Sequence, residues 1–133
     1  MTKIIRSEDC GNSPKNKFVE NIEIAIAKND TEFLLSAIDS DIHWHIIGQK
    51  SAQGTNEFLE TLTGIFQSSE VAEITINHVM THGKAGSVNG SRKHKNGKTY
   101  QFCTVYEFSN AKGTSVKEIT HYAIESNLYP KVK

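Results

Sequence analysis

The sequence is poor in the features that mark disulfide-rich, membrane-spanning or strongly charged proteins. Only two of its 133 residues are cysteine, and no Cys-x-x-Cys spacing occurs that could hold zinc. Fifteen Lys and Arg residues balance fifteen Asp and Glu residues, so the formal net charge is zero and does not point to a nucleic acid or an anionic membrane as a partner. No apolar run approaches the ~20 residues of a membrane span.

The length and the two ends of the chain set the expected organisation. The first residues, MTKIIRSEDC, lack the apolar core of a signal peptide, so we expect a cytoplasmic protein. A chain of 133 residues is long enough for one domain with a sizeable core. We expect residues 1–12 to be a flexible N-terminus, residues 13–126 to form a single domain and residues 127–133 to be a C-terminal tail.

Helical signals dominate the first half of the chain. Ser13 and Pro14 suit the N-cap and the first position of a helix, and apolar residues then recur at helical spacing as far as Ile26. The other expected elements are a second helix over 31–38, a strand over 42–47, a polar loop over 48–54 and a third helix that Thr55 caps and that ends near residue 68. Helices segregated from a sheet indicate an α+β fold.

The stretch from Ile74 to Tyr122 predicts four antiparallel strands joined by three tight turns. Asn96-Gly97 favours a two-residue type I′ turn, because both residues tolerate positive φ. Gly83-Lys84 fits a type II′ turn, and residues 110–113 fit a four-residue hairpin loop.

These turns predict which side chains share the buried face of the sheet. The expected apolar members are Ile74, Ile76, Met80, Phe102, Phe108, Ile119 and Ala123. Polar groups interrupt this face: one row reads His78, Asn89, Thr104 and Ile119, and its neighbours are Ser87, Tyr106, Ser91 and His121. Arg92 falls on the opposite, mostly polar face. A buried polar group without a partner costs about 1–3 kcal/mol, so such a cluster should be hydrogen-bonded or line a cavity. The alternative is a small inner-face cluster without a ligand, and a one-residue slip at any turn would invert part of this map.

The order of elements resembles the nuclear transport factor 2-like superfamily, in its SnoaL-like branch, which includes ketosteroid isomerase-like proteins. The segments that carry the resemblance are IAIAKNDTEFLLSAIDSDIHWHIIG, the helix start GTNEFLETL and NGKTYQFCTVYEFSNAKGTSVKEITHY, and together they span about residues 14–125. The resemblance implies a cystatin-like cone in the order α-α-β-α-β-β-β-β, with three N-terminal helices packed on a curved antiparallel sheet. It also implies an internal pocket and a homodimer through the outer sheet face.

The same resemblance disfavours two activities. The positions that match the catalytic groups of ketosteroid isomerase are Ile46, Ile22 and Thr104, which cannot run that acid/base scheme. The Asp-Arg-Asp set of the related epoxide hydrolases has no evident counterpart on the predicted inner face. Function must therefore be argued from the site rather than from the fold.

His78 and His121 are the candidate acid/base residues, because a histidine exchanges protons near neutral pH and both map to the inner face. The alternative is that His78 is a hydrogen-bonded core histidine and His121 only lines the wall. The other residues expected to line the pocket are Trp44, Asn89, Phe102, Thr104, Tyr106 and Ile119. No cofactor is expected.

The His43-Trp44-His45 pattern places two metal-ligand residue types at alternate positions of a strand. His43 and His45 lie on one face of a strand and could bind a divalent ion with a third ligand, which the sequence does not identify. The resemblance places Trp44 inward and both histidines outward, so no metal site is expected. The basic run at residues 92–95 is interpreted as a solvated hairpin tip.

These observations predict a protein that binds a small, partly apolar organic molecule. If it is an enzyme, we expect cofactor-independent isomerisation or aldol-type cyclisation with His78 or His121 as the base. The alternative is a non-catalytic, dimeric ligand-binding or protein-interaction module.

Overall fold

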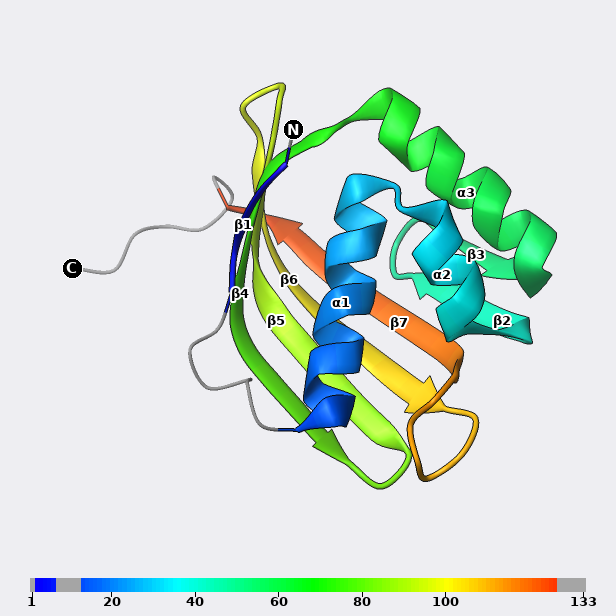
Figure 1. The fold of residues 1–133 in the computed structure, drawn as a ribbon. Coiled ribbons are helices and arrows are strands. Elements are labelled where there is room, and N and C mark those ends of the chain that lie inside the picture. Colours follow the sequence, from blue (N-terminus) through cyan, green and yellow to red (C-terminus); the bar gives the residue numbers. More distant parts are fainter. Residues whose placement is uncertain (1, 7–12, 127–133) are drawn as a thin grey trace.

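The computed structural model describes residues 2–6 and 13–126, in which a curved seven-stranded sheet wraps around the first helix (Figure 1). The helices are α1 (Pro14–Lys28), α2 (Thr31–Ala37) and α3 (Gly54–Ser68). The strands are β1 (Lys3–Ile5), β2 (Ile38–Ile46), β3 (Lys50–Gln53), β4 (Val71–His82), β5 (Ala85–His94), β6 (Thr99–Phe108) and β7 (Val116–Glu125). Their order across the sheet is β1-β4-β5-β6-β7-β2-β3.

This architecture confirms the expected α+β cone of helices on a curved sheet, with two corrections. The sheet is mixed rather than antiparallel, because β1 pairs in parallel with β4 and β2 pairs in parallel with β7. The predicted order also lacked β1, which lies in the segment expected to be flexible, and β3, which lies in the expected polar loop. Both are edge strands too short to show a hydrophobic period. Residues 7–12 and 127–133 of the predicted terminal segments lie outside the described residues.

Helix α1 forms where its capping residues predict it. The Ser13 side chain accepts a hydrogen bond from the Asn16 backbone N–H at 3.3 Å, and Pro14 occupies the first turn. The helix ends at Asn29, whose φ of 59° is left-handed and whose N–H bonds back to the last turn. Its buried stripe carries two carboxylates, Glu20 and Glu23, among apolar residues.

Strand β2 follows α2 without a loop. It begins at Ile38 rather than at the expected residue 42, and its alternation buries Ile42, Trp44 and Ile46. None of the helices in the described part of the chain has the length and apolar content that a membrane crossing requires.

The Asn96-Gly97 turn differs from the prediction. Gly97 has a φ of 91°, but Asn96 does not have positive φ, which a type I′ turn would require. The His94 N–H instead donates to the Lys98 carbonyl at 2.8 Å, and the Gly97 N–H donates to the His94 carbonyl at 3.0 Å. This is a longer hairpin loop with glycine at its left-handed position.

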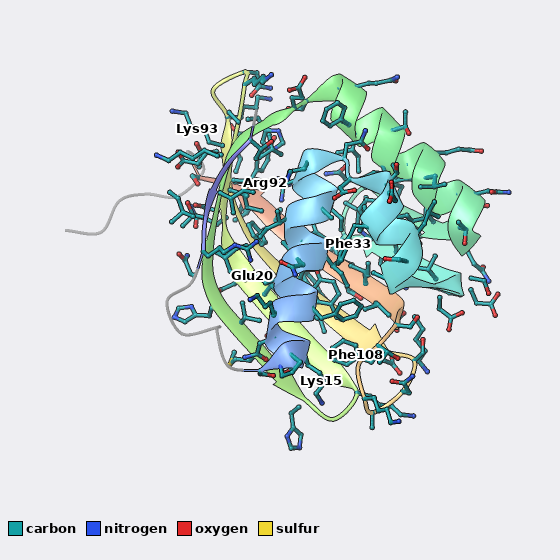
Figure 2. The ribbon with its side chains drawn as sticks, viewed as in Figure 1. Lys15, Glu20, Phe33, Arg92, Lys93 and Phe108 are labelled. Carbon is teal, nitrogen blue, oxygen red and sulfur yellow. The ribbon has the colours of Figure 1, made fainter. Side chains whose placement is uncertain are left out.

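The extra loop residue shifts the β5–β6 register by one, which turns β5 over. Gly90, not Ser91, lies opposite Phe102, and Arg92 lies on the inner face. Figure 2 shows Arg92 on the side of the helices and the neighbouring Lys93 pointing away from them. The predicted inward positions of Ser87, Asn89 and Ser91 and the predicted outward position of Arg92 are therefore wrong.

Strand β4 contains a bulge that the sequence did not predict. The β4–β5 register shifts between Ile76 and His78, so Ile76 is buried whereas His78 and Met80 are exposed, with Met80 65% exposed. Gly90 faces this bulge, where an added Cβ would lie 1.9 Å from the Thr75 carbonyl oxygen. His78 and Met80 retain their predicted partners Asn89 and Ser87, so they turn outward together with β5, and their predicted inward positions are wrong.

The β6–β7 pairing is displaced from the prediction by two residues, so Thr104 pairs with His121 rather than with Ile119. A shift of two retains the face of every side chain. Ile119 and His121 therefore remain on the inner face, as expected.

Candidate functional site

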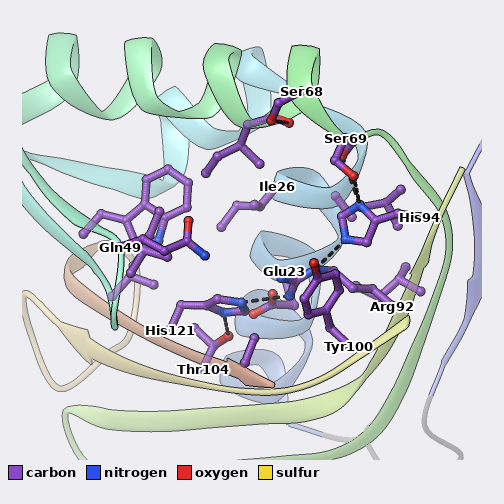
Figure 3. Close-up of a pocket in the computed structure, with 18 residues that line it drawn as sticks. Glu23, Ile26, Gln49, Ser68, Ser69, Arg92, His94, Tyr100, Thr104 and His121 are labelled. Carbon is purple, nitrogen blue, oxygen red and sulfur yellow. Dashed lines mark hydrogen bonds between the residues drawn. The ribbon is translucent and has the colours of Figure 1, made fainter. Parts of the chain in front are cut away.

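A cavity of about 270 Å³ lies between α1, the C-terminal part of α3 and the inner face of the sheet (Figure 3). Its apolar wall consists of Ile26, Ala27, Trp44, Ile46, Ile65, Val71, Ile74, Ile119 and Ala123. Its polar wall consists of Glu23, Gln49, Ser68, Ser69, Arg92, His94, Tyr100, Thr104 and His121. A largely apolar cavity with a few convergent polar groups is the usual form of a small-molecule site.

Arg92 connects the polar groups of this wall. Its Nε donates to His94 Nε2 at 3.0 Å, and its Nη1 lies 2.8 Å from His121 Nε2. A guanidinium is a donor only and stays charged, so both imidazoles accept from it and carry their proton on Nδ1. Arg92 thus selects the neutral form and one tautomer of each ring.

The two Nδ1 atoms have partners of their own. His121 Nδ1 lies 2.7 Å from Thr104 Oγ1, and His94 Nδ1 lies 3.0 Å from the Ser69 carbonyl oxygen (Figure 3). Burial and the neighbouring Arg92 charge lower the pKa of His121 to about 3, and the same two causes lower the pKa of His94. Neither ring is suited to take up a proton near neutral pH.

Glu23 is the carboxylate of the cavity. Tyr106, which is fully buried on β6, donates its hydroxyl to Glu23 Oε1 at 2.6 Å, and the Thr104 hydroxyl also hydrogen-bonds to Glu23. Burial raises the pKa of Glu23, whereas the two hydrogen bonds and the Arg92 charge act in the opposite direction. A carboxyl with a raised pKa can exchange a proton nearer to neutral pH than an exposed one.

Two further groups complete the wall. Trp44 on β2 is 3% exposed and packs on Phe58 with a ring-centroid distance of 4.7 Å, and its Nε1–H has no hydrogen-bond partner among the described residues. Tyr100 on β6 lies beneath the guanidinium of Arg92, 5.1 Å from Arg92 Cζ to the ring centroid.

The structure brings together some of the predicted site residues and separates others. Trp44, Thr104, Ile119 and His121 line the cavity. Two predicted lining residues, Phe102 and Tyr106, are buried behind the wall, where Phe102 stacks on His121 with centroids 5.9 Å apart and Tyr106 contacts Glu23. His78 and Asn89 lie outside the cavity and hydrogen-bond to each other at 3.1 Å on the outer face.

Sequence reasoning missed the groups that dominate the electrostatics of the cavity. Glu23 gave a usable signal, because a glutamate on the apolar stripe of a helix is either paired or functional. Arg92 and His94 gave none, because the faces of β5 depend on the hairpin register that was predicted one residue out. Tyr100 lies on β6, whose inner face was predicted correctly, and it lines the cavity.

The His43-Trp44-His45 pattern does not form a metal site in the described part of the chain, where no three potential ligands are suitably grouped. His45 Nε2 instead pairs with Glu118 Oε2 at 2.8 Å and its Nδ1 lies 3.2 Å from Ser51 Oγ. Both histidines lie on the face opposite to Trp44, as expected.

No protein-family model and no curated protein matches the sequence. Similar solved structures do exist. A Shewanella denitrificans protein assigned as a SnoaL-like polyketide cyclase is 12% identical, with a TM-score of 0.71 over 84% of this chain and 92% of that one. An NTF2-like protein of unknown function from Burkholderia pseudomallei is 16% identical, with a TM-score of 0.69 over 87% of this chain and 95% of that one. An LEH-like epoxide hydrolase from M. tuberculosis is 16% identical, with a TM-score of 0.68 over 83% of this chain and 82% of that one.

These similarities agree with the resemblance in the sequence. The chain has the nuclear transport factor 2-like fold that the SnoaL-like proteins share. At such identities the likeness establishes the fold and leaves the chemistry to the residues of the cavity.

Proposed function

We propose that this protein binds a small, partly apolar carbonyl compound in the cavity and catalyses a cofactor-independent proton transfer on it, as an isomerase or cyclase. The observation that carries the proposal is the Glu23 carboxyl, which lies in the cavity wall with a raised pKa, two hydrogen-bond donors and a nearby cation. An ionisable group perturbed in this way inside a cleft is a candidate general base.

The proposed chemistry uses two groups. The Glu23 carboxylate takes a proton from the carbon next to a carbonyl group, and the electron pair of that C–H bond forms an enolate. Arg92 stabilises the negative charge on the enolate oxygen. Glu23 then returns the proton to another carbon, which gives an isomer. In a cyclisation the enolate carbon instead attacks a second carbonyl of the same molecule, and Glu23 protonates the resulting alkoxide.

The base is assigned to Glu23 rather than to the histidines predicted from sequence. The lone pair of His121 Nε2 already accepts from Arg92, and its pKa of about 3 makes the ring a weak base. His78 is exposed on the outer face, away from the cavity. The role we assign to His121 is to orient the Arg92 guanidinium.

The similar solved structures include proteins of this reaction class and one hydrolase, and the carboxylate of the cavity favours the former. Three of them are assigned as polyketide cyclases, including those from Sinorhizobium meliloti and Shewanella denitrificans, and one is an epoxide hydrolase. Glu23 is the only carboxylate among the described residues that line the cavity. An Asp-Arg-Asp arrangement with two carboxylates around the arginine therefore has no counterpart there.

The test is hydrogen–deuterium exchange at the acidic C–H groups of small cyclic ketones and 1,3-diketones in D₂O, followed by proton NMR. We expect the protein to accelerate exchange of at least one compound and Glu23→Gln to lower that rate by about 10²–10⁴-fold. Glu107→Gln, the same change on the outer face, and His121→Gln should each stay within about tenfold of the parent. Exchange that persists in Glu23→Gln, or that fails only in His121→Gln, would contradict the assignment.

A separate observation supports a second candidate function, that of a dimeric interaction module. The outer sheet face exposes several large apolar side chains, among them Met80, Val105, Tyr122 and Ile124. A homodimer through this face would bury them.

A further inference from the structure

Arg92 has unused hydrogen-bonding capacity inside the cavity. Two of the five guanidinium N–H groups bond to His94 and His121, and the structure records no further partner for the guanidinium among the described residues. The ring of Tyr100 lies under it, and Arg92 Cζ lies 5.9 Å from the centroid of the Phe102 ring, so two aromatic rings contact the guanidinium in addition to the histidines at its edges.

The charge of Arg92 is also incompletely compensated. Both histidines that contact it accept hydrogen bonds and are neutral, and no ion pair of the described residues includes Arg92. The Glu23 carboxyl acts on Arg92 through space, but its hydrogen bonds come from Tyr106 and Thr104. A cation built into a low-dielectric wall without a direct counterion favours an anion beside it.

A second donor of the cavity lacks an acceptor. The Nε1–H of Trp44 is buried and unpartnered within the described chain, although Trp44 lines the same cavity as Arg92. A buried N–H without an acceptor is destabilising by about 1–3 kcal/mol, and such groups are usually satisfied by water, an ion or a ligand. A ligand oxygen would satisfy it.

The apolar wall and the volume of the cavity limit the size and polarity of the rest of the ligand. Its apolar residues come from α1, α3 and the three strands β2, β4 and β7, with Ile26 and Ile65 opposite the strands that carry Arg92 and His121. The volume of about 270 Å³ lies just below the range for small-molecule pockets, which is about 300–1,000 Å³. The space suits a short molecule with an apolar body.

The geometry points to a short organic acid as the ligand, with its carboxylate on the guanidinium of Arg92, an oxygen within reach of the Trp44 indole N–H and its apolar body against the isoleucines. This inference rests on the proposed function, because it names the ligand class of the same cavity. Arginine suits this role because its planar fork matches the two oxygens of a carboxylate.

Trp44 makes the test direct, since it is the only tryptophan of the chain and its indole N–H gives one NMR signal. The ¹⁵N-labelled protein is titrated near neutral pH with benzoate and with its neutral isostere benzamide. We expect benzoate to shift the indole signal and to bind about tenfold more tightly than benzamide. Arg92→Met should remove the preference for benzoate, whereas Lys93→Met, which removes a neighbouring charge on the outer face, should retain it.

The comparison of benzoate with benzamide is made in the parent protein, so it remains informative even if Arg92→Met does not fold. Equal affinities for benzoate and benzamide would overturn the anion assignment but leave a small-molecule function intact, and a preference that survives in Arg92→Met would also overturn it. No response to either probe would overturn it as well. The deuterium exchange of Glu23→Gln decides the proposed proton transfer separately, because it does not depend on benzoate binding.

Discussion

Arg92 Nη1 donates to His121 Nε2 at 2.8 Å, and this contact keeps the imidazole neutral inside the fold. Protonation of the ring would put a proton on the nitrogen that accepts from a permanent cation, so it would break the bond and set two positive charges side by side. The same constraint keeps His94 neutral, because its Nε2 accepts a hydrogen bond from Nε of the same guanidinium. The sheet therefore carries two histidines that must stay neutral for the site to persist.

The first prediction is a loss of stability in mild acid. The folded pKa of His121, about 3, lies below the ordinary value of 6.5, so its contribution is fully present above pH 6.5 and is lost as the pH falls toward 3. In this window, each such histidine lowers the free energy of unfolding by up to about 1.4 kcal/mol for every unit by which the pH falls. We expect His121 alone to lower the free energy of unfolding by roughly 2 kcal/mol between about pH 6.5 and pH 5.

The measurement is urea unfolding followed by Trp44 fluorescence at both pH values. His121→Gln can still accept a hydrogen bond from Arg92, and it should reduce the acid loss. His82→Gln removes an exposed histidine at a hairpin end and should leave the acid loss of the parent unchanged. An equal loss in the parent and in His121→Gln would show that other groups cause it.

The second prediction concerns Gly90, which lies against the β4 bulge. An added Cβ would lie 1.9 Å from the Thr75 carbonyl oxygen, and backbone cannot move away as a flexible side chain can. We expect Gly90→Ala to lower the free energy of unfolding by about 1–3 kcal/mol or more in urea unfolding. If the variant is as stable as the parent, the bulge is not held at this position.

Gly64 supplies a matched control for the same substitution. It lies within α3, and an added Cβ there would meet nothing within 4 Å. Because alanine favours a helix interior over glycine, Gly64→Ala should raise the free energy of unfolding by about 0.5–1 kcal/mol. The two variants should thus change stability in opposite directions.

The bulge and the Asn96-Gly97 loop explain which parts of the structure the sequence could predict. The helices, the Ser13 cap of α1, the α+β class and the faces of β6 and β7 follow from periodicity and local residues. The expected Thr55 cap of α3 is wrong, because Gln53 is at the N-cap position and makes no side-chain cap hydrogen bond. The faces of β5 and of the second half of β4 do not, because one extra residue inverts a strand. Asn-Gly suits both a two-residue turn and the longer loop, so local sequence does not separate them.

The residues of the candidate site were predictable only where the face of their strand was predictable. Trp44, Thr104, Ile119 and His121 lie on strands whose faces were predicted correctly, and they line the cavity. Arg92 and His94 share β5, where the register error placed Arg92 on the outer face and His94 was expected at a solvated hairpin tip. His121 is neutral because it accepts a hydrogen bond from Arg92, and no sequence pattern predicts this contact.

The third prediction tests the contact between Tyr106 and Glu23. The hydroxyl donates at 2.6 Å within the core, and burial together with Glu23 raises the pKa of Tyr106 well above its ordinary value, so it stays the donor. Tyr106→Phe should lower the free energy of unfolding by about 1–3 kcal/mol, because a buried acceptor loses its partner. It should also raise the pKa of Glu23 further and move the pH profile of any proton exchange to higher pH.

Tyr122→Phe is the control for this change. Tyr122 is 48% exposed on the outer face, so loss of its hydroxyl should alter stability by no more than about 0.5 kcal/mol. Urea unfolding of both variants and the pH profile of deuterium exchange give the two readouts. A Tyr106→Phe variant with unchanged stability and profile would show that this hydrogen bond does not tune Glu23.

The fourth prediction concerns the outer sheet face. Val105 is 42% exposed and lies beside Thr120 on β7, between the exposed side chains of Met80 and Tyr122, so a lysine there would place a charge within the proposed dimer interface. We expect the parent protein to be a dimer in size-exclusion chromatography with light scattering, and Val105→Lys to be a monomer, because a buried unpaired charge opposes association. Leu35→Lys, at an equally exposed apolar residue of α2, should remain a dimer. A monomeric parent, or a dimer that survives Val105→Lys, would rule out this face as the interface.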